Sequence, residues 1–327
     1  MPSRKIEQQL DQLNTLRSQP ATEATARALC KALADRVNLV VAKAAAIAGE
    51  LQCRELLPDL EIAFERFFQK PVETDPQCWA KNALSKTLKD LEYAESALFL
   101  CGLRHVQMEP VYKGHADTAA TLRGTCALAL AQCRDIPSQE IMQHLVNALA
   151  DSAASVRVDA VRALEQMDGD AAALLLRLKA RMGDPEPEVT GQALDSLLSI
   201  ERDAGVEFVA GFLRLRDEDT REQAALALGA SRLASAVEAL KEAWSRSRTV
   251  HSSEPLLRAL SISRQESGFE FLLQLIRDGR EQDALEVLNA LRLHRESPEI
   301  MKRVRNAAEV RGGPVLNLFR ERFESGC

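Results

Sequence analysis

The chain has 327 residues, of which 46% are hydrophobic, 28% are charged and only 4% are aromatic. With 15 glycines and 12 prolines, it holds too little of either residue for a collagen-like, low-complexity or turn-rich all-β protein. A net charge of −6 gives no general attraction to a nucleic-acid backbone or an anionic membrane surface.

The first segment of the chain is polar. Residues 5–17 carry charged and amide side chains and lack the apolar core of a secretory signal, so we expect a polar N-terminal cap over residues 1–21. The longest uncharged stretches, at 124–133 and 141–150, are half the length that a membrane helix requires. These features predict a cytoplasmic protein without a membrane span.

Small and apolar residues recur at helical spacing from residue 22 to about residue 310. The central residue of each such segment serves as an anchor, and the anchors are Ala44, Ala83, Cys126, Ala160, Ala193, Ala224, Leu256 and Val287. The first two intervals are near forty residues, and the later ones are just above thirty. A period of this length with helical patterning is typical of one helical hairpin per repeat.

We therefore predict an all-α fold, an α-solenoid of about eight or nine stacked hairpins that forms a single domain over residues 1–327. Longer, irregular repeats occupy residues 22–137, with insertions at 70–78 and 102–117, and regular repeats of 31–34 residues occupy 138–293. Residues 294–327 form the C-terminal cap. No sheet is required by this pattern.

One repeat carries a recognisable run of residues. The run consists of Asp151, Val156, Arg157, Ala160, Ala163 and Leu164. It resembles the short HEAT repeats of lyase-like, armadillo-like α-solenoids. In that family the arginine position pairs with a turn acid of its own or a neighbouring repeat. Arg123 and Arg221 match Arg157, whereas Thr190 departs from the pattern. The resemblance therefore implies a structural ladder of arginine–acid pairs along the repeats.

The resemblance also implies that the second helix of each repeat lines a concave surface. We expect this surface to carry a set of polar side chains three residues apart on each helix. The set is Asp159, Arg162, Gln192, Asp195, Gln223, Arg258, Glu286 and Asn289. The mixture of acids, bases and amides lacks the basic stripe and aromatic stacking partners of a nucleic-acid groove. Helical-repeat DNA glycosylases use tryptophan there, and Trp244 lies on a partner helix instead.

Sequence signatures of catalysis are missing. None of the five histidines is followed by glutamate, whereas deoxyhypusine hydroxylase, a helical-repeat enzyme, binds iron through repeated His-Glu pairs. No zinc-protease, phosphate-loop, nucleophile-elbow or dinucleotide motif occurs. We predict no enzymatic activity, cofactor or metal. A four-ligand site from Cys101, His105, His115 and Cys126 is a minor alternative.

The two insertions hold the candidate binding residues. Prolines interrupt the segment 70–78, and Asp75 followed by Pro76 predicts a helix start that places Trp79 in the first turn. The segment 102–117 is predicted to be a surface loop, and a loop that contacts a partner or ligand is the functional alternative. The candidates are Trp79, Arg104, His105, Glu109, Tyr112, Lys113, His115 and Asp117. Our hypothesis is that both insertions project from one edge and form one contact surface.

These observations predict a non-enzymatic scaffold or adaptor that binds an unidentified protein through its concave face and insertions, as a monomer or weak oligomer. The alternative is a ligand-handling, lyase-like accessory protein with a groove under the 102–117 segment. A nucleic-acid-binding solenoid is the third possibility. The basic C-terminal stretch 292–322 could contact an acidic partner, although a solvated end cap explains it equally.

Overall fold

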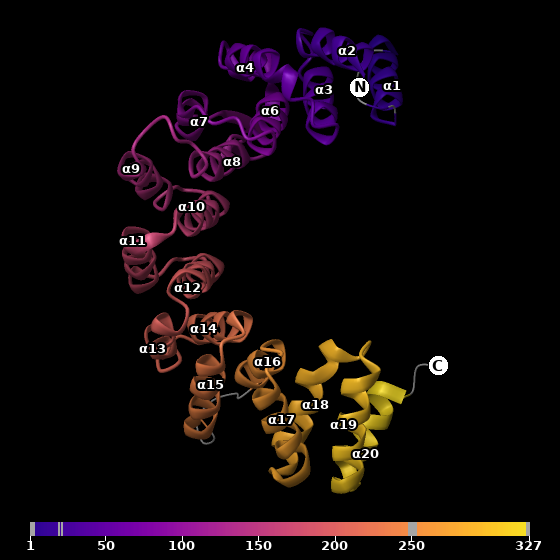
Figure 1. Cartoon of the computed structure of the whole chain (residues 1–327), viewed down its shortest axis with the longest axis vertical. Helices are drawn as coiled ribbons and strands as arrows, with labels where there is room; N and C mark the ends of the chain where they lie inside the picture. Colours follow the sequence, from indigo (N-terminus) through magenta and orange to yellow (C-terminus); the bar gives the residue numbers. More distant parts are fainter. Residues whose placement is uncertain (1–3, 19, 21, 248–253, 325–327) are drawn as a thin grey trace. The chain divides into compact units, whose positions relative to one another are not determined.

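The structure, a computed structural model, describes residues 4–18, 20, 22–247 and 254–324 (Figure 1). Within these residues the predicted all-α architecture is confirmed, since helices α1 to α20 account for nearly all of the regular structure, and short 3-10 and π-helical turns and two short strands form the rest. No helix in this part of the chain has the length and apolar character needed to cross a membrane. The chain divides into two compact units, Met1–Asp168 and Gly169–Cys327.

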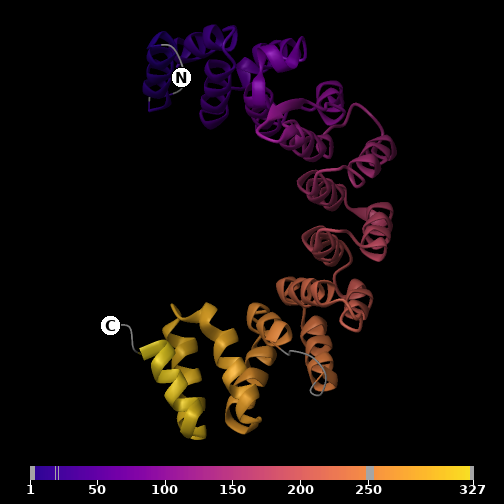
Figure 2. The same cartoon turned by 180° about the vertical axis from the view of Figure 1, so that it is seen from behind.

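The N-terminal unit contains ten helices and both strands among its described residues. The helices are α1 (Arg4–Arg17), α2 (Glu23–Leu33), α3 (Asn38–Glu50), α4 (Leu57–Arg66), α5 (Pro71–Thr74), α6 (Trp79–Asp90), α7 (Ser96–Leu103), α8 (Ala120–Leu130), α9 (Ser138–Ala148) and α10 (Ala154–Met167), and the strands are β1 (Met108–Val111) and β2 (Gly114–Asp117). Helices α2/α3, α4/α6, α7/α8 and α9/α10 pack as hairpins, and α1 packs on α3. The second helices of these hairpins, α3, α6, α8 and α10, stack in sequence (Figures 1 and 2).

The C-terminal unit repeats this arrangement. Its helices are α11 (Gly169–Met182), α12 (Pro187–Glu201), α13 (Asp203–Phe212), α14 (Glu218–Ser231), α15 (Ala234–Ser247), α16 (Glu254–Ile262), α17 (Glu266–Asp278), α18 (Glu281–Ala290), α19 (Pro298–Arg311) and α20 (Gly313–Phe319). A 3-10 turn covers Leu291–His294, and a π-helical turn covers Arg320–Glu324. Here the second helices α12, α14, α16 and α18 stack on one another, and α11, α13, α15 and α17 are their hairpin partners.

The repeat anchors explain why the hairpins stack. Each second helix from α3 to α18 carries one anchor, and every anchor except Ala83, which is half-buried, lies in the core. Small residues let neighbouring second helices approach closely. The carbonyl oxygen of Ala259 on α16 lies only 2.4 Å from where a Cβ on Gly229 of α14 would stand. The predicted hairpin period is therefore confirmed, because each anchor lies on the second helix of its hairpin.

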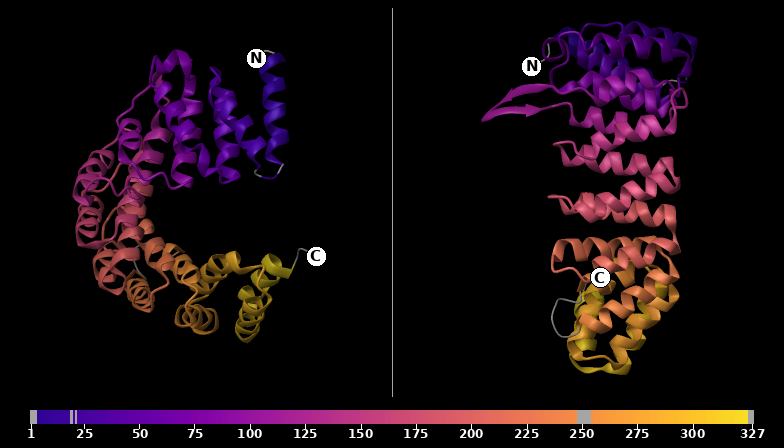
Figure 3. Two further views of the ribbon diagram at one scale, coloured as in Figure 1. Left: turned by 45° about the horizontal axis from the view of Figure 1, so that its top comes forward. Right: turned by 90° about the vertical axis from the view of Figure 1, so that its left-hand side faces the viewer.

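The prediction of a surface loop at 102–117 is wrong for residues 108–117, which form an antiparallel β-hairpin. Its register pairs Met108 with Asp117 and Val111 with Gly114. Gly114 adopts a φ of +132° directly after the two-residue turn, a conformation that glycine tolerates and most other residues do not. The hairpin projects from the helices of its unit in the right-hand view of Figure 3. The helix start near Pro76 is confirmed, because a 3-10 turn over Pro76–Cys78 leads into α6.

Candidate functional site

The two insertions of the N-terminal unit contact each other. The backbone N–H of Gln77 donates to Oε1 of Glu109 over 2.6 Å, and Nε2 of Gln107 donates to the carbonyl oxygen of Asp75 over 2.9 Å. Residues distant in sequence thus hold the β-hairpin against the start of α6. We call residues 70–79 and 102–117 together the insertion surface.

A buried carboxylate organises the base of the insertion surface. Asp75 is fully buried and accepts hydrogen bonds from the backbone N–H groups of Ala80 (2.8 Å) and Lys81 (3.0 Å), which are otherwise unpaired at the start of α6. The amide of Asn38 on α3 donates to the same carboxylate over 3.0 Å. Asp75 therefore ties α3, the first insertion and α6 together.

Lys81 is the cationic partner of this carboxylate. Its Nζ lies 3.0 Å from Oδ2 of Asp75, and both side chains are fully shielded from solvent. Nζ also donates to the carbonyl oxygen of Phe67 over 3.3 Å and lies 5.8 Å from the ring centroid of Phe68. A buried ammonium is tolerated only with such compensation, so these contacts fix the position of Lys81.

Glu109 anchors the hairpin to this network. Its carboxylate is 8% exposed and accepts hydrogen bonds from Nε2 of Gln107 (2.6 Å) and Oγ1 of Thr118 (2.7 Å), in addition to Gln77. Burial alone would raise the pKa of Glu109, but these three donors together lower it below its ordinary value. Glu109 is therefore an ionised anchor that points into the molecule.

His105 lies at the edge of the same network. Its Nε2 donates to Oε1 of Gln107 over 3.1 Å, and its ring packs edge-to-face on Phe68 with centroids 5.0 Å apart. Burial lowers the pKa of His105 and outweighs the opposing effect of the Gln107 hydrogen bond. A neutral imidazole in these contacts packs the hairpin base.

An arginine connects the hairpin to the next repeat. Nε and Nη2 of Arg123 donate to the two carboxylate oxygens of Asp151 over 2.7 and 2.9 Å, and Nη1 donates to Asp117 over 2.6 Å. Burial would raise the pKa of both carboxylates, yet backbone N–H donors and Arg123 lower them. The ladder expected from the repeat pattern is present at this step, since Arg123 pairs with a turn acid of its own and of the neighbouring repeat.

The eight candidates predicted in the insertions fall into two groups. Five are exposed, and they are Trp79, Arg104, Tyr112, Lys113 and His115. The other three, His105, Glu109 and Asp117, point inward and hold the hairpin in place, as the contacts above show. These three are positioning residues, which corrects the expectation that they contact a partner directly.

The sequence reasoning missed the buried roles of Asp75, Lys81 and Gln107, which carry much of the network. A signal was present, because Lys81 shares the buried face of α6 with Leu84 and Leu88 at i+3 and i+7. A lysine within such an apolar stripe requires an acidic partner nearby.

Large apolar side chains are unusually exposed on the insertion surface. Among the described residues of the N-terminal unit, those that are exposed are Ile62, Val72, Trp79, Val106, Met108, Val111, Tyr112 and Val146. All but Ile62 and Val146 belong to the insertion surface. Tyr112 at the hairpin tip is 97% exposed, and Trp79 is 53% exposed. Such clustering marks an interaction site more often than scattered apolar residues do.

The eight residues predicted for the concave surface all lie on second helices. Arg162 and Asn289 are exposed, and the other six are half-buried. Gln192, Asp195 and Gln223 line a shallow groove of about 230 Å³ between α12 and α14. Gly191 makes room there for the side chain of Gln223, whose Oε1 would lie 2.1 Å from a Cβ at that position. The groove offers amide and carboxylate groups at a contact between repeats.

The proposed minor metal alternative is not supported by the arrangement of its ligands. Cys126 is fully buried in α8, and burial raises the pKa of its thiol, whereas His115 is exposed on β2. Across the described ranges, no three His, Cys, Asp or Glu side chains are placed to share a metal ion.

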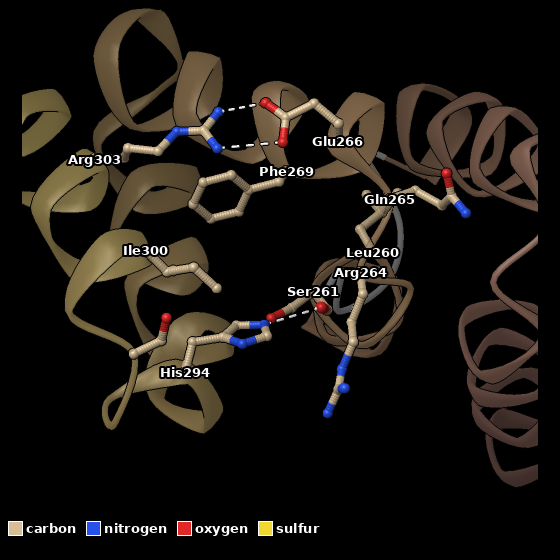
Figure 4. Close-up of a pocket in the computed structure, with 10 residues that line it drawn as sticks. Leu260, Ser261, Arg264, Gln265, Glu266, Phe269, His294, Ile300 and Arg303 are labelled. Atoms are coloured by element: carbon tan, nitrogen blue, oxygen red, sulfur yellow. Dashed lines mark hydrogen bonds and ion pairs between the residues drawn. The ribbon is translucent and has the colours of Figure 1, made fainter.

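A pocket of about 370 Å³ lies in the C-terminal unit between α16, α17 and α19 (Figure 4). At one end, Nε2 of His294 donates to the carbonyl oxygen of Ser261 over 3.0 Å. At the other end, Arg303 forms an ion pair with Glu266 and lies 4.6 Å from the ring centroid of Phe269. These contacts join α16 and α17 to the end of the unit, so the lining is accounted for by packing.

Comparison with known proteins shows no family for the chain. No family model and no curated protein sequence matches the chain. A solved structure of human deoxyhypusine hydroxylase in complex with glycerol is similar over 81% of this chain and 93% of that chain, at 18% identity and a TM-score of 0.31. A similarity this low carries no functional argument.

Proposed function

We propose that this chain is a non-enzymatic, cytoplasmic HEAT-repeat scaffold or adaptor that binds a protein partner through the insertion surface and the faces of its second helices. The observation that carries the proposal is the concentration of exposed apolar side chains on the insertion surface. Contact of Met108, Val111 and Tyr112 with water costs free energy, and a partner that covers these side chains removes that cost.

Rigidity of the hairpin supports the same function. Glu109 and Gln107 fix β1 to the start of α6, and Arg123 fixes the end of β2 through Asp117. A pre-organised hairpin loses less conformational entropy on binding than a flexible loop would. The buried network therefore serves to present the exposed residues in one arrangement.

Charge around the apolar side chains indicates the character of the partner. Arg104 and Lys113 are both exposed, and neither has an ion-pair partner within the described residues. A complementary protein surface would have an apolar centre with carboxylates at its rim.

The ligand-handling alternative receives less support. It requires open space beneath the 102–117 segment, but Gln107 and Glu109 fill the base of the hairpin with their own hydrogen bonds. The exposed residues instead face outward, which suits a protein surface better than a small ligand.

The test is affinity capture followed by a binding measurement with the purified partner. Three forms are compared, namely wild type, a Val111→Ser/Tyr112→Ser variant, and Ile62→Ser as a matched control. Ile62 is 63% exposed and belongs to neither insertion. We expect the hairpin variant to bind about tenfold or more weakly, with the control unchanged. Equal affinity of all three forms would contradict the proposal, and binding abolished by moderate salt and by added nucleic acid would favour the nucleic-acid alternative.

A further inference from the structure

Helix α11 of the C-terminal unit exposes an apolar stripe that the proposed function does not use. Leu174, Leu178 and Met182 follow one another at i, i+4 and i+8, so they lie on one face of the helix. Their exposed fractions are 66%, 56% and 76%. Ala171 and the half-buried Leu175 extend the same face.

This face is unusual within its unit. The opposite face of α11 is buried through Ala172, Leu176 and Ala180, so the helix carries apolar side chains on its outer face as well as on its inner face. Among the described residues of the other first helices of this unit, α13, α15 and α17, no large apolar side chain is exposed. The solvent-facing side of a surface helix is normally polar, so the apolar outer stripe of α11 marks an interaction surface.

Charges on one flank of the stripe identify the partner. Asp170 begins the helix and Arg181 lies near its end, and both are exposed on the same side of the stripe. Arg181 lies 4.8 Å from the ring centroid of Phe208 and 5.3 Å from that of Phe212. Neither Asp170 nor Arg181 has an ion-pair partner among the described residues. Because its two ends carry opposite charges, this flank is complementary to the same flank of a second, antiparallel copy of the helix.

We propose that α11 is a homodimer interface in which two copies of the helix pack antiparallel about a two-fold axis. The two-fold axis is perpendicular to both helices and passes between them at the level of Leu176. Leu174 and Leu178 are equally far from that level, so Leu174 of each copy lies against Leu178 of the other. The same operation keeps each flank on its own side, so Asp170 of one copy meets Arg181 of the other, twice. A parallel two-fold pairing would place the charged flanks of the two copies on opposite sides of the interface, where Asp170 and Arg181 could not meet.

The interface is a small one. A single pair of four-turn helices buries less surface than the roughly 1,200 Å² at the low end of stable complexes. The dimer is therefore a reversible one that forms as the protein concentration rises. Its residues belong to the C-terminal unit, whereas the insertion surface belongs to the N-terminal unit.

Analytical ultracentrifugation of the full chain over a range of concentrations tests this proposal. We expect wild type to shift from monomer to dimer, and Leu178→Glu to remain monomeric. Val310→Glu is the matched control, because Val310 on α19 is 74% exposed and lies outside the stripe, and it should dimerise as wild type does. Circular dichroism confirms that each variant is folded.

A charge exchange tests the antiparallel arrangement itself. Asp170→Arg and Arg181→Asp should each weaken the dimer by about threefold or more, and the double exchange should restore it, since opposite charges then face each other again. A wild type that stays monomeric at every concentration, a Leu178→Glu variant that still dimerises, or a double exchange no better than the single ones would overturn the proposal.

Discussion

Lys81 and Asp75 form an ion pair with no exposure to solvent, in which Nζ and Oδ2 are 3.0 Å apart. Asp75 has more additional hydrogen-bond partners than Lys81 has. Asp75 accepts three further hydrogen bonds, from Asn38 and from the N–H groups of Ala80 and Lys81. The ammonium of Lys81 donates one further hydrogen bond, to the carbonyl oxygen of Phe67, and lies over the ring of Phe68. This asymmetry makes the pair a sensitive test of how the N-terminal unit is held together.

The two single substitutions should differ in cost. Asp75→Ala leaves a buried ammonium and an uncapped α6, so we expect it to lower the free energy of unfolding by about 3–5 kcal/mol. Lys81→Met leaves a carboxylate that keeps three donors, so the loss should be smaller, about 2 kcal/mol. Urea unfolding followed by circular dichroism measures both. Lys86→Met, at an exposed pair with Asp90, is the control and should change stability little. A larger loss for Lys81→Met than for Asp75→Ala would contradict this account.

The role of Glu109 as an anchor can be tested by hydrogen exchange. Glu109→Gln removes the charge that the Gln77 N–H, Gln107 and Thr118 donate to, and it introduces an amide N–H₂ among existing donors. We expect the backbone amides of β1 and β2 to exchange about tenfold faster or more. Amides of α12 and α14, in the other unit, provide the internal reference. Unchanged protection in the hairpin would show that Glu109 does not hold it.

The Arg123 contacts predict an acid-dependent loss of stability. Asp117 and Asp151 have folded pKa values below their ordinary ones, so their contribution is complete above the unfolded value of about 3.9 and is lost as pH falls through the folded values. Arg123→Met should lower the free energy of unfolding by about 3 kcal/mol near neutral pH. The difference from wild type should shrink below about pH 4, where the carboxylates become protonated.

Urea titrations at neutral pH and in acid measure this difference directly. Arg54→Met is a suitable control, because Arg54 pairs with Glu92 at the surface, where both side chains are more than half exposed. A gap between wild type and Arg123→Met that stays constant with pH would exclude ion pairing as the source of the effect.

Close packing between second helices predicts an unusual response to alanine. Replacing glycine by alanine inside a helix normally stabilises it by about 1 kcal/mol. At Gly229, however, the new Cβ would stand 2.4 Å from the backbone oxygen of Ala259, and backbone cannot yield as a side chain can. We expect Gly229→Ala to destabilise the protein by about 1–3 kcal/mol.

Gly191→Ala is the matched comparison. Its Cβ would meet mainly the end of the Gln223 side chain, which can rotate away, so the loss should be smaller than at Gly229. Thermal unfolding of both variants measures the difference. Equal melting temperatures would show that the layers of the C-terminal unit shift to accommodate a methyl group.

Two features could be read from the sequence with little ambiguity. The helical hairpins and their period follow from small and apolar residues at helical spacing, because a hairpin cannot bury its apolar face alone and must stack on its neighbours. The anchors from Ala160 to Val287 locate the second helices for the same reason. The sequence also predicts where the insertions lie, because they lengthen the first two intervals between anchors.

The β-hairpin and the hydrogen-bond network that anchors it could not be predicted from the sequence. Pro110 within Met108–Val111 argues against a strand, and such a residue is accepted only at a sheet edge. Asp75 and Gln107 are 32 residues apart, and nothing local to either residue indicates that they meet. The sequence therefore predicts Glu109, Asp117 and His105 as binding residues, whereas in the structure their side chains hold the hairpin in place.

The sequence by itself determined which helices form and how they pair, because helical periodicity and capping act over a few residues and small side chains set the contact between neighbouring repeats. Only the tertiary structure decided which polar residues are buried as anchors and which apolar ones, such as Tyr112 and Leu178, remain exposed. Burial depends on packing between segments that are far apart in the chain. A pattern along the sequence predicts the apolar and polar faces of each helix, but it does not predict which segment covers each face.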